Sequence, residues 1–227
     1  IIFVDTVFDA DLSVVKTSAD DGIIWAKEVE DYQRFGVVVT DAQGFMTRIV
    51  EKPKTPISKL ANIGLYYIRD VEALWKGIDH TLSSPANLGE FFLTDAFQWM
   101  IEQGRRILTA EVGGWYDCGK LDTLLETNEI LLTQGASRST SFPGVTIIEP
   151  VRIEDEVTIE RSTIGPNVTV DRGTTITDSE ISHSIIGSKC TIAGSRLTRS
   201  MLGTEVVIKQ LRGAASLGDH GEILGNG

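Results

Sequence analysis

The sequence reads Ser162-Thr163-Ile164-Gly165, then Ser184-Ile185-Ile186-Gly187, then Ser200-Met201-Leu202-Gly203. Around these copies an aliphatic residue recurs every five or six positions, at Ile153, Ile159, Ile164, Val170, Ile176, Ile181, Ile186, Ile192, Leu197, Leu202 and Ile208. Fixed-period self-similarity is typical of a solenoid. A period of about six residues suits a triangular parallel β-helix, in which the recurrent aliphatic residue points inward and stacks on its copies. A β-sandwich usually repeats at about 8–12 residues, so the period favours the β-helix.

The two halves of the chain differ in pattern. Residues 1–135 alternate strand-like and helix-like segments, which favours an α/β sheet covered by helices. We assign residues 136–227 to the β-helix, with repeats at about 145–211. The tail from Arg212 loses the period, and we expect it either to cap the β-helix or to be disordered.

Apolar and turn patterns predict the elements of the first half. Residues 1–4 are a short apolar run of the kind buried in parallel sheets. A hairpin is expected from residues 35–40 and 45–50, with further strands at 61–68 and 107–112. Helices are expected at 71–77 with Asp70 as N-cap, at 93–103 with Gly104 as C-cap, and at 121–134.

Charge and composition exclude several classes of function. The chain has 227 residues and a formal net charge of −11, which argues against non-specific nucleic-acid binding and against an anionic membrane surface. No apolar run reaches the roughly 18–20 residues of a transmembrane helix. Cys118 and Cys190 are far apart and form no metal-binding pattern. Two isolated cysteines suit a reducing compartment, so we expect a cytoplasmic protein, although one pair of cysteines does not exclude a disulfide. From the net charge we expect no nucleic-acid and no membrane partner.

Six short blocks in the first half carry a family resemblance. They are Ile2-Phe3-Val4-Asp5, Tyr32 to Val38, Glu51-Lys52-Pro53, Asn62 to Tyr67, Gly89-Glu90 with Leu93-Thr94-Asp95, and Trp115 to Gly119. In this order they resemble the sugar-1-phosphate nucleotidyltransferases, especially the glucose-1-phosphate thymidylyltransferase type. The resemblance implies a partial Rossmann-like nucleotidyltransferase domain, followed by a left-handed parallel β-helix, which many family members carry.

The reaction that the resemblance implies joins a sugar 1-phosphate to a nucleoside triphosphate and releases pyrophosphate. Glucose 1-phosphate and dTTP are the favoured substrates. As the resemblance implies, Asp5 and Asp117 would hold Mg²⁺, a hard cation that prefers carboxylate oxygens. The ordinary structural alternatives are that Asp5 caps a turn and that Asp117 caps the following helix.

The resemblance also implies the sugar side of the site. Lys52 would contact the sugar phosphate as a point charge, and Glu51 would hydrogen-bond sugar hydroxyls. Gly36 and Gly64 would let the backbone approach the hexose closely, although turn or bulge geometry would explain both glycines equally well. Two further residues, Asn62 and Tyr67, are pocket candidates, and core packing is the alternative for Tyr67.

The chain departs from the family pattern in two places. Val4 and Thr6 flank Asp5, where the family usually has Gly before and often Asn after. The Gly-rich loop that cradles the triphosphate has no counterpart in these residues. We therefore expect the 227-residue chain alone not to turn over a nucleoside triphosphate.

Two other functions stay open at this point. One is a non-catalytic regulatory or assembly subunit. The other is a β-helix acyltransferase with His183 as general base, although an outward position on a solenoid corner is the more ordinary role for this histidine. In each case the flat faces of the β-helix predict a homo-oligomer.

Overall fold

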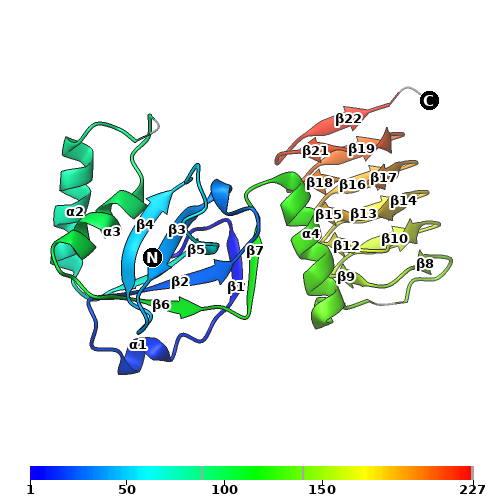
Figure 1. Ribbon diagram of the computed structural model, residues 1–227. Coiled ribbons are helices and arrows are strands. Elements are labelled where there is room, and N and C mark those ends of the chain that lie inside the picture. The colour runs from blue at the N-terminus through cyan, green and yellow to red at the C-terminus, as the bar shows by residue number, and fades with distance from the viewer. Residues whose placement is uncertain (88, 140, 226–227) are drawn as a thin grey trace. The chain divides into compact units, whose positions relative to one another are not determined.

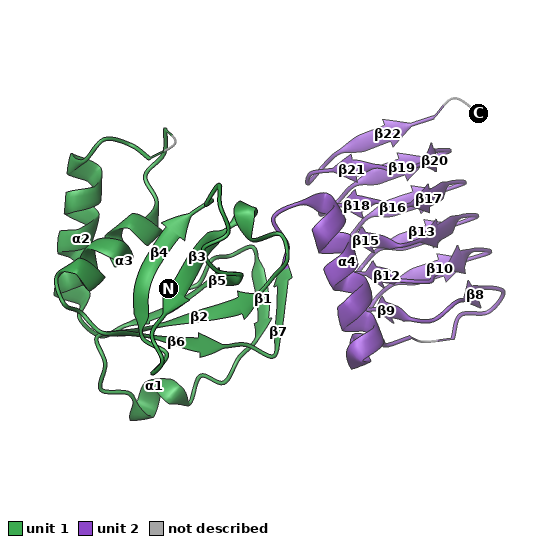
Figure 2. Ribbon diagram, viewed as in Figure 1, with its two compact units in different colours: residues 1–116 green, residues 117–227 purple. Residues whose placement is uncertain are grey.

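A computed structural model describes residues 1–87, 89–139 and 141–225 (Figure 1). The chain divides into two compact units, Ile1–Tyr116 and Asp117–Gly227 (Figure 2). The α/β prediction for the first half and the β-helix prediction for the second are both confirmed. Among the described residues, no helix has the length and apolar character needed to cross a bilayer.

Unit 1 is built on a five-stranded mixed sheet. Strands β2 and β6 run parallel, and the other neighbouring strands run antiparallel. The order across the sheet is β4 (Met46–Glu51), β3 (Gly36–Thr40), β5 (Leu60–Ile68), β2 (Gly22–Glu28) and β6 (Ile107–Glu111). A separate two-stranded sheet pairs β1 (Thr6–Asp9) with β7 (Gly114–Asp117).

Both faces of the large sheet are packed. Helices α2 (Val71–Ser83) and α3 (Leu93–Glu102) cover one face (Figure 1), where Phe97 and Met100 are fully buried. The other face buries Trp25 against side chains that include those of β1 and the short helix α1 (Val14–Thr17). Because β2 is buried on both faces, its Ile-Ile-Trp-Ala run lacks the alternation of apolar and polar residues that marks a half-exposed strand. For this reason β2 is not among the strands expected from the sequence.

Most predicted elements of unit 1 are present. The hairpin over residues 35–50 forms as β3 and β4. Asp70 caps α2, because its carboxylate accepts a hydrogen bond from the Ala73 N–H at 2.9 Å. This helix continues to Ser83, six residues past its predicted end. Gly104 follows α3 with a φ of 77°, as expected of a C-cap glycine.

The prediction that residues 1–4 form a buried parallel strand is wrong. Their side chains are 44% to 104% exposed. Ile2 forms only an isolated antiparallel bridge with Leu65, and the Phe3 N–H donates to the Gly64 carbonyl at 2.9 Å. The edge of β5 is open to this segment because β3 pairs with β5 only at Ala61.

Unit 2 begins with helix α4 (Leu121–Leu131), which ends in the wider turn η2 (Leu132–Ala136). The division into compact units places this helix in the second unit. The sequence-based domain boundary at residue 135 is a separate assignment and stays a prediction. The helix is joined to the β-helix, where the Thr169 hydroxyl donates to the Asn128 side chain at 2.6 Å and Arg199 pairs with Asp122 at 2.7 Å.

In the described part of this unit, fifteen short strands follow, five on each of three parallel sheets. The first sheet contains β8 (Thr146–Ile147), β11 (Thr163–Ile164), β14 (Glu180–Ser182), β17 (Arg196–Thr198) and β20 (Arg212–Gly213). The second contains β9 (Val151–Ile153), β12 (Val168–Val170), β15 (Ser184–Ile186), β18 (Met201–Leu202) and β21 (Ser216–Leu217). The third contains β10 (Thr158–Glu160), β13 (Thr175–Thr177), β16 (Thr191–Ala193), β19 (Val207–Lys209) and β22 (Glu222–Leu224).

The recurrent aliphatic residues form the core of the β-helix. All eleven that the sequence analysis singled out are buried. They stack in register, as where Ile176, Ile192 and Ile208 lie opposite one another on successive coils. This stacking buries apolar surface continuously along the axis, so each coil stabilises its neighbours.

The tail from Arg212 is a fifth coil, with strands β20, β21 and β22. The repeats therefore extend past residue 211, where we expected them to end. Two features hide the period in this part of the sequence. Gly213 occupies the position opposite the inward Leu197, so the aliphatic marker is missing there. The step from Leu202 to its partner Leu217 is also 15 residues, one fewer than the step from Ile186 to Leu202.

Buried serines join the coils at two corners. At the first, the hydroxyls of Ser162, Ser179 and Ser195 each donate to the carbonyl two residues earlier, at 2.7 to 2.9 Å. Each oxygen also accepts a backbone N–H from the next coil, at 3.0 to 3.2 Å. Ser184 and Ser200 repeat the arrangement at another corner. The repeated serine thus satisfies polar groups that burial would otherwise leave unpaired.

We predict that Ser179→Ala destabilises the β-helix by about 1–3 kcal/mol, because the buried Ser195 N–H loses its acceptor. Far-UV circular dichroism during thermal unfolding measures the change. All tryptophans and tyrosines lie in residues 1–116, so their fluorescence follows unit 1 and should not move. The exposed Ser216→Ala is the matched control. Equal stability of the two variants would contradict the role given to the serines.

Candidate functional site

The candidate site begins where Gly36 lies opposite Glu51 in the β3–β4 ladder. A Cβ atom at position 36 would lie 2.8 Å from Glu51 Oε2, 2.9 Å from Thr94 Cγ2 and 3.5 Å from Asn62 Nδ2. These distances show that the Glu51, Asn62 and Thr94 side chains converge on the space above Gly36. A larger residue at position 36 would fill the space that the three side chains leave.

Glu51 is a partly buried acid with one close hydrogen-bond donor. The Thr94 hydroxyl, at the start of α3, donates to Glu51 Oε2 at 3.0 Å. Burial raises the pKa of Glu51, and the Thr94 hydrogen bond and the Lys52 charge oppose the shift only in part. The carboxylate is therefore poorly hydrated, which favours hydrogen bonds with ligand hydroxyls over bulk water.

Lys52 is held beside Glu51 in a left-handed backbone conformation, with φ of 45°. Its ammonium lies 3.7 Å from Glu90 Oε2 and 4.9 Å from the centre of the Phe92 ring. The side chain is still 43% exposed, so an anion can reach it. Glu90 and Phe92 were absent from our predicted site, although Glu90 stands in one of the motif blocks.

Strand β5 separates the remaining pocket candidates between its two faces. Asn62 lies near Gly36, whereas Tyr67 packs among the side chains on the opposite face, with Trp25 and Ile63. Gly64 has a φ of 78°, and a Cβ there would lie 2.8 Å from the Phe3 side chain. The structure thus brings Gly36, Glu51, Lys52 and Asn62 together, and it does not bring Tyr67 to them.

Tyr66 and Trp115 are buried polar side chains that the predicted site did not include. Trp115 Nε1 has no hydrogen-bond partner among the described residues. The Tyr66 hydroxyl has none of normal geometry there, although the Asn62 side chain lies close enough to act on its pKa. Tyr66 follows Asn62 and Gly64 at two-residue spacing, so it shares their face of β5. Burial raises the pKa of the Tyr66 phenol, which keeps the hydroxyl protonated as a donor. The two-residue period of the strand was the signal that could have found it.

The two predicted metal ligands lie at the ends of paired strands. Asp5 is exposed in the turn before β1, and Asp117 ends β7, the strand that pairs with β1. The Asp117 carboxylate accepts the Gly119 N–H at 3.0 Å, which shapes the turn before α4. Asp5 belongs to unit 1 and Asp117 opens unit 2, so a metal shared between them stays a prediction.

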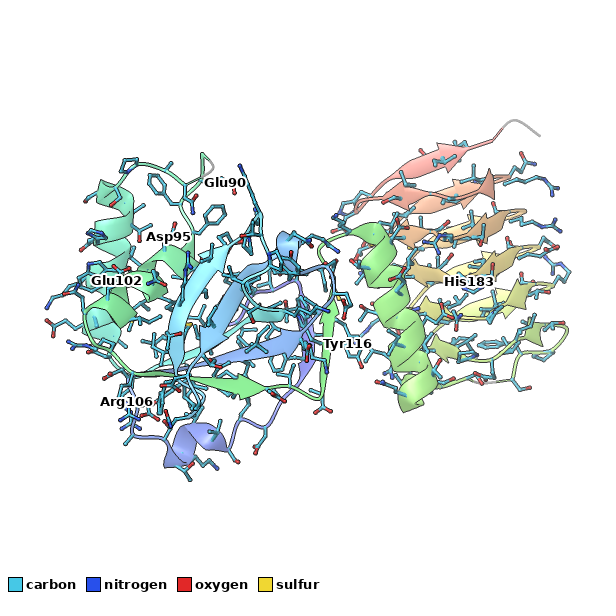
Figure 3. The ribbon with its side chains drawn as sticks, viewed as in Figure 1. Glu90, Asp95, Glu102, Arg106, Tyr116 and His183 are labelled. Atoms are coloured by element: carbon cyan, nitrogen blue, oxygen red, sulfur yellow. The ribbon has the colours of Figure 1, made fainter. Side chains whose placement is uncertain are left out.

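His183 occupies the corner between β14 and β15 (Figure 3). Its backbone is left-handed, with φ of 46°, and its side chain is 42% exposed. The ring lies 3.3 Å from the Asn167 amide and 3.9 Å from the Glu129 carboxylate. These features agree with an outward residue on a solenoid corner.

The chain is similar to known nucleotidyltransferases. A model of the nucleotidyl transferase family matches residues 4–134. The low-salt glycan biosynthesis nucleotidyltransferase Agl11 of Haloferax volcanii is 38% identical over 47% of this chain and 29% of its own length. A glucose-1-phosphate thymidylyltransferase of Streptomyces griseus is 25% identical over 91% of this chain and 63% of its own. The bifunctional protein GlmU of Methanococcus aeolicus is 35% identical over 70% and 37%. The chain thus spans less than two thirds of these relatives.

We predict that Glu51 makes unit 1 less stable as pH rises. Its pKa in the folded protein lies above the ordinary 4.5, so between those two values the native state binds more protons than the unfolded chain. The free energy of unfolding therefore falls as pH increases through that window. In the Glu51→Gln variant, the decrease in unfolding free energy that Glu51 causes across this pH window should be absent. Urea unfolding followed by tryptophan fluorescence from pH 4 to pH 7 measures it, and identical pH dependence of both proteins would refute the assignment.

Proposed function

Because this chain belongs to the nucleotidyl transferase family, we propose that the complete protein joins a sugar 1-phosphate to a nucleoside triphosphate, giving a nucleotide sugar and pyrophosphate. One observation carries the proposal. Within the residues that match the family, a partly buried acid and a reachable ammonium, Glu51 and Lys52, stand side by side next to Gly36. This pairing suits a ligand that has neutral hydroxyls at one end and a single anionic group at the other.

In the proposed reaction, an oxygen of the sugar phosphate attacks the α-phosphorus of the triphosphate in line. The bond from the α-phosphorus to the bridging oxygen breaks, and pyrophosphate leaves with the electron pair. The attacking oxygen is already ionised, so no general base is needed. Catalysis then depends on positioning and on neutralising negative charge. Lys52 would hold the sugar phosphate, and Glu90 would have to give way to it.

We propose that the hexose lies over Gly36 and within reach of Glu51 and Asn62. The Glu51 carboxylate would accept hydrogen bonds from sugar hydroxyls, and Asn62 could donate or accept. Gly64 and Tyr67 stay pocket candidates from the family resemblance alone. Glucose 1-phosphate and dTTP are the proposed substrates, on the ground of similarity to a glucose-1-phosphate thymidylyltransferase.

A divalent cation, Mg²⁺, is part of this proposal, with Asp5 and Asp117 as its protein ligands. Mg²⁺ typically binds one or two carboxylates together with water and substrate phosphates, so this donor set fits it. The cation would neutralise charge on the reacting phosphates. We further propose a cytoplasmic homo-oligomer assembled through the β-helix faces, and a purely monomeric protein in sedimentation would contradict the assembly.

We predict that Lys52→Ala weakens glucose 1-phosphate binding at least about tenfold, because a charge-assisted contact to phosphate contributes roughly 1.5–3 kcal/mol. Isothermal titration calorimetry measures the dissociation constant. Lys54→Ala removes another exposed charge two residues away and should bind like the wild type. Equal losses in both variants would mean that only net charge matters.

The complete protein should form a nucleotide sugar from glucose 1-phosphate and dTTP, and Asp117→Asn should abolish it. Product formation is followed by chromatography and by pyrophosphate release. Sugar phosphate binding without any turnover would instead favour a non-catalytic regulatory or assembly subunit. Acyl transfer from an acyl-CoA that is lost in His183→Ala would favour the acyltransferase.

A further inference from the structure

A pocket between α2 and α3 lies outside the residues assigned to the sugar phosphate. Its volume is about 260 Å³. His80 in the last turn of α2 and Ser84 just after this helix form one wall, and α3 forms the other with Asp95, Trp99 and Glu102. The connection between the helices closes it, with Asn87 and Phe91 in the lining. This volume lies just below the roughly 300–1,000 Å³ of typical small-molecule pockets, so it suits a small organic group.

The charges around this α2–α3 pocket favour a cation. Asp95 and Glu102 lie on one face of α3 at a spacing of seven residues (Figure 3). The wall opposite is the C-terminal turn of the 13-residue helix α2, where the helix dipole is negative. No Lys or Arg side chain lines the pocket among the described residues. Burial raises the pKa of Asp95, and a hydrogen bond from the Asn87 side chain opposes this shift only in part.

Aromatic rings make the pocket suited to an organic cation rather than a metal ion. The His80 and Trp99 rings are 6.0 Å apart with an interplanar angle of 32°. Phe91 is 51% exposed although it lines the pocket, so a ligand could cover its ring. Ammonium and guanidinium groups bind over such rings while a nearby carboxylate takes their hydrogen bonds.

The same connection also carries the contacts to Lys52. Phe91 faces the pocket, whereas its neighbours Glu90 and Phe92 contact the Lys52 ammonium. On α3, Asp95 follows Thr94, which donates to Glu51. Along this stretch of chain, residues that line the pocket therefore alternate with residues that contact Lys52 or Glu51. A ligand that packs on Phe91 and pairs with Asp95 would fix this connection. The neighbouring Glu90 carboxylate would then stay in contact with the Lys52 ammonium.

We propose that the α2–α3 pocket binds a small organic cation carrying an ammonium or guanidinium group, and that this ligand weakens sugar phosphate binding by keeping Glu90 on Lys52. The binding itself is independent of the proposed function. Only the second part rests on the role of Lys52 there.

Calorimetric titration with agmatine, with the uncharged 1,4-butanediol as control, tests the site. We expect saturable agmatine binding to the wild type and none of butanediol. Asp95→Asn should weaken it at least about tenfold, as expected for loss of a charged partner, and Phe91→Leu should weaken it too. Asp79→Asn, an exposed change on α2 outside the lining, should not. Circular dichroism checks that each variant is folded. No agmatine binding, or unchanged binding in Asp95→Asn, would overturn the site.

The coupling is measured separately. With saturating agmatine, the dissociation constant of glucose 1-phosphate should rise at least about threefold, and glucose 1-phosphate should weaken agmatine by the same factor. Glu90→Gln should remove the effect. An unchanged constant would overturn the coupling and leave the site. If glucose 1-phosphate fails to bind while agmatine binds, the proposed function fails and the pocket assignment stands.

Discussion

The pairing of Gly36 with Glu51 across β3 and β4 is the constraint on which the candidate site depends. Since Gly36 has no side chain, the Glu51 carboxylate can lie beside Thr94 and Asn62 instead of being pushed aside. The register of one hairpin therefore determines where the acid lies. It also fixes the next residue, Lys52, whose left-handed backbone carries its ammonium to Glu90 and Phe92.

Local charge, rather than net charge, explains how an acidic chain could receive a phosphate. The formal net charge is −11, but the ammonium of Lys52 is partly exposed and has only one carboxylate within 4 Å among the described ion pairs. The adjacent Glu51 is partly buried and hydrogen-bonded to the Thr94 hydroxyl, so its carboxylate is available to ligand hydroxyls rather than to bulk water. A ligand with both hydroxyls and a phosphate uses the two environments at once.

A feature of the fold could be predicted from the sequence where residues close together in the chain determine it. The β-helix was predictable because each coil packs only on adjacent coils, so one inward aliphatic residue per strand marks the fold. The interior strand β2 was not predictable, since burial on both faces removes any periodic signal. Motif order singled out Glu51 and Lys52, which the structure places beside Gly36. It did not separate Tyr67 from Tyr66, which lie on opposite faces of β5. It also did not reveal the α2–α3 pocket, which forms only when the two consecutive helices pack together.

A structure of the protein with glucose 1-phosphate bound would show whether Gly36, Glu51 and Lys52 form the sugar phosphate site. We expect the phosphate at Lys52 Nζ with Glu90 displaced, and the hexose over Gly36 with its hydroxyls hydrogen-bonded to Glu51. A sugar phosphate bound elsewhere, with the contact between Lys52 and Glu90 intact, would contradict it.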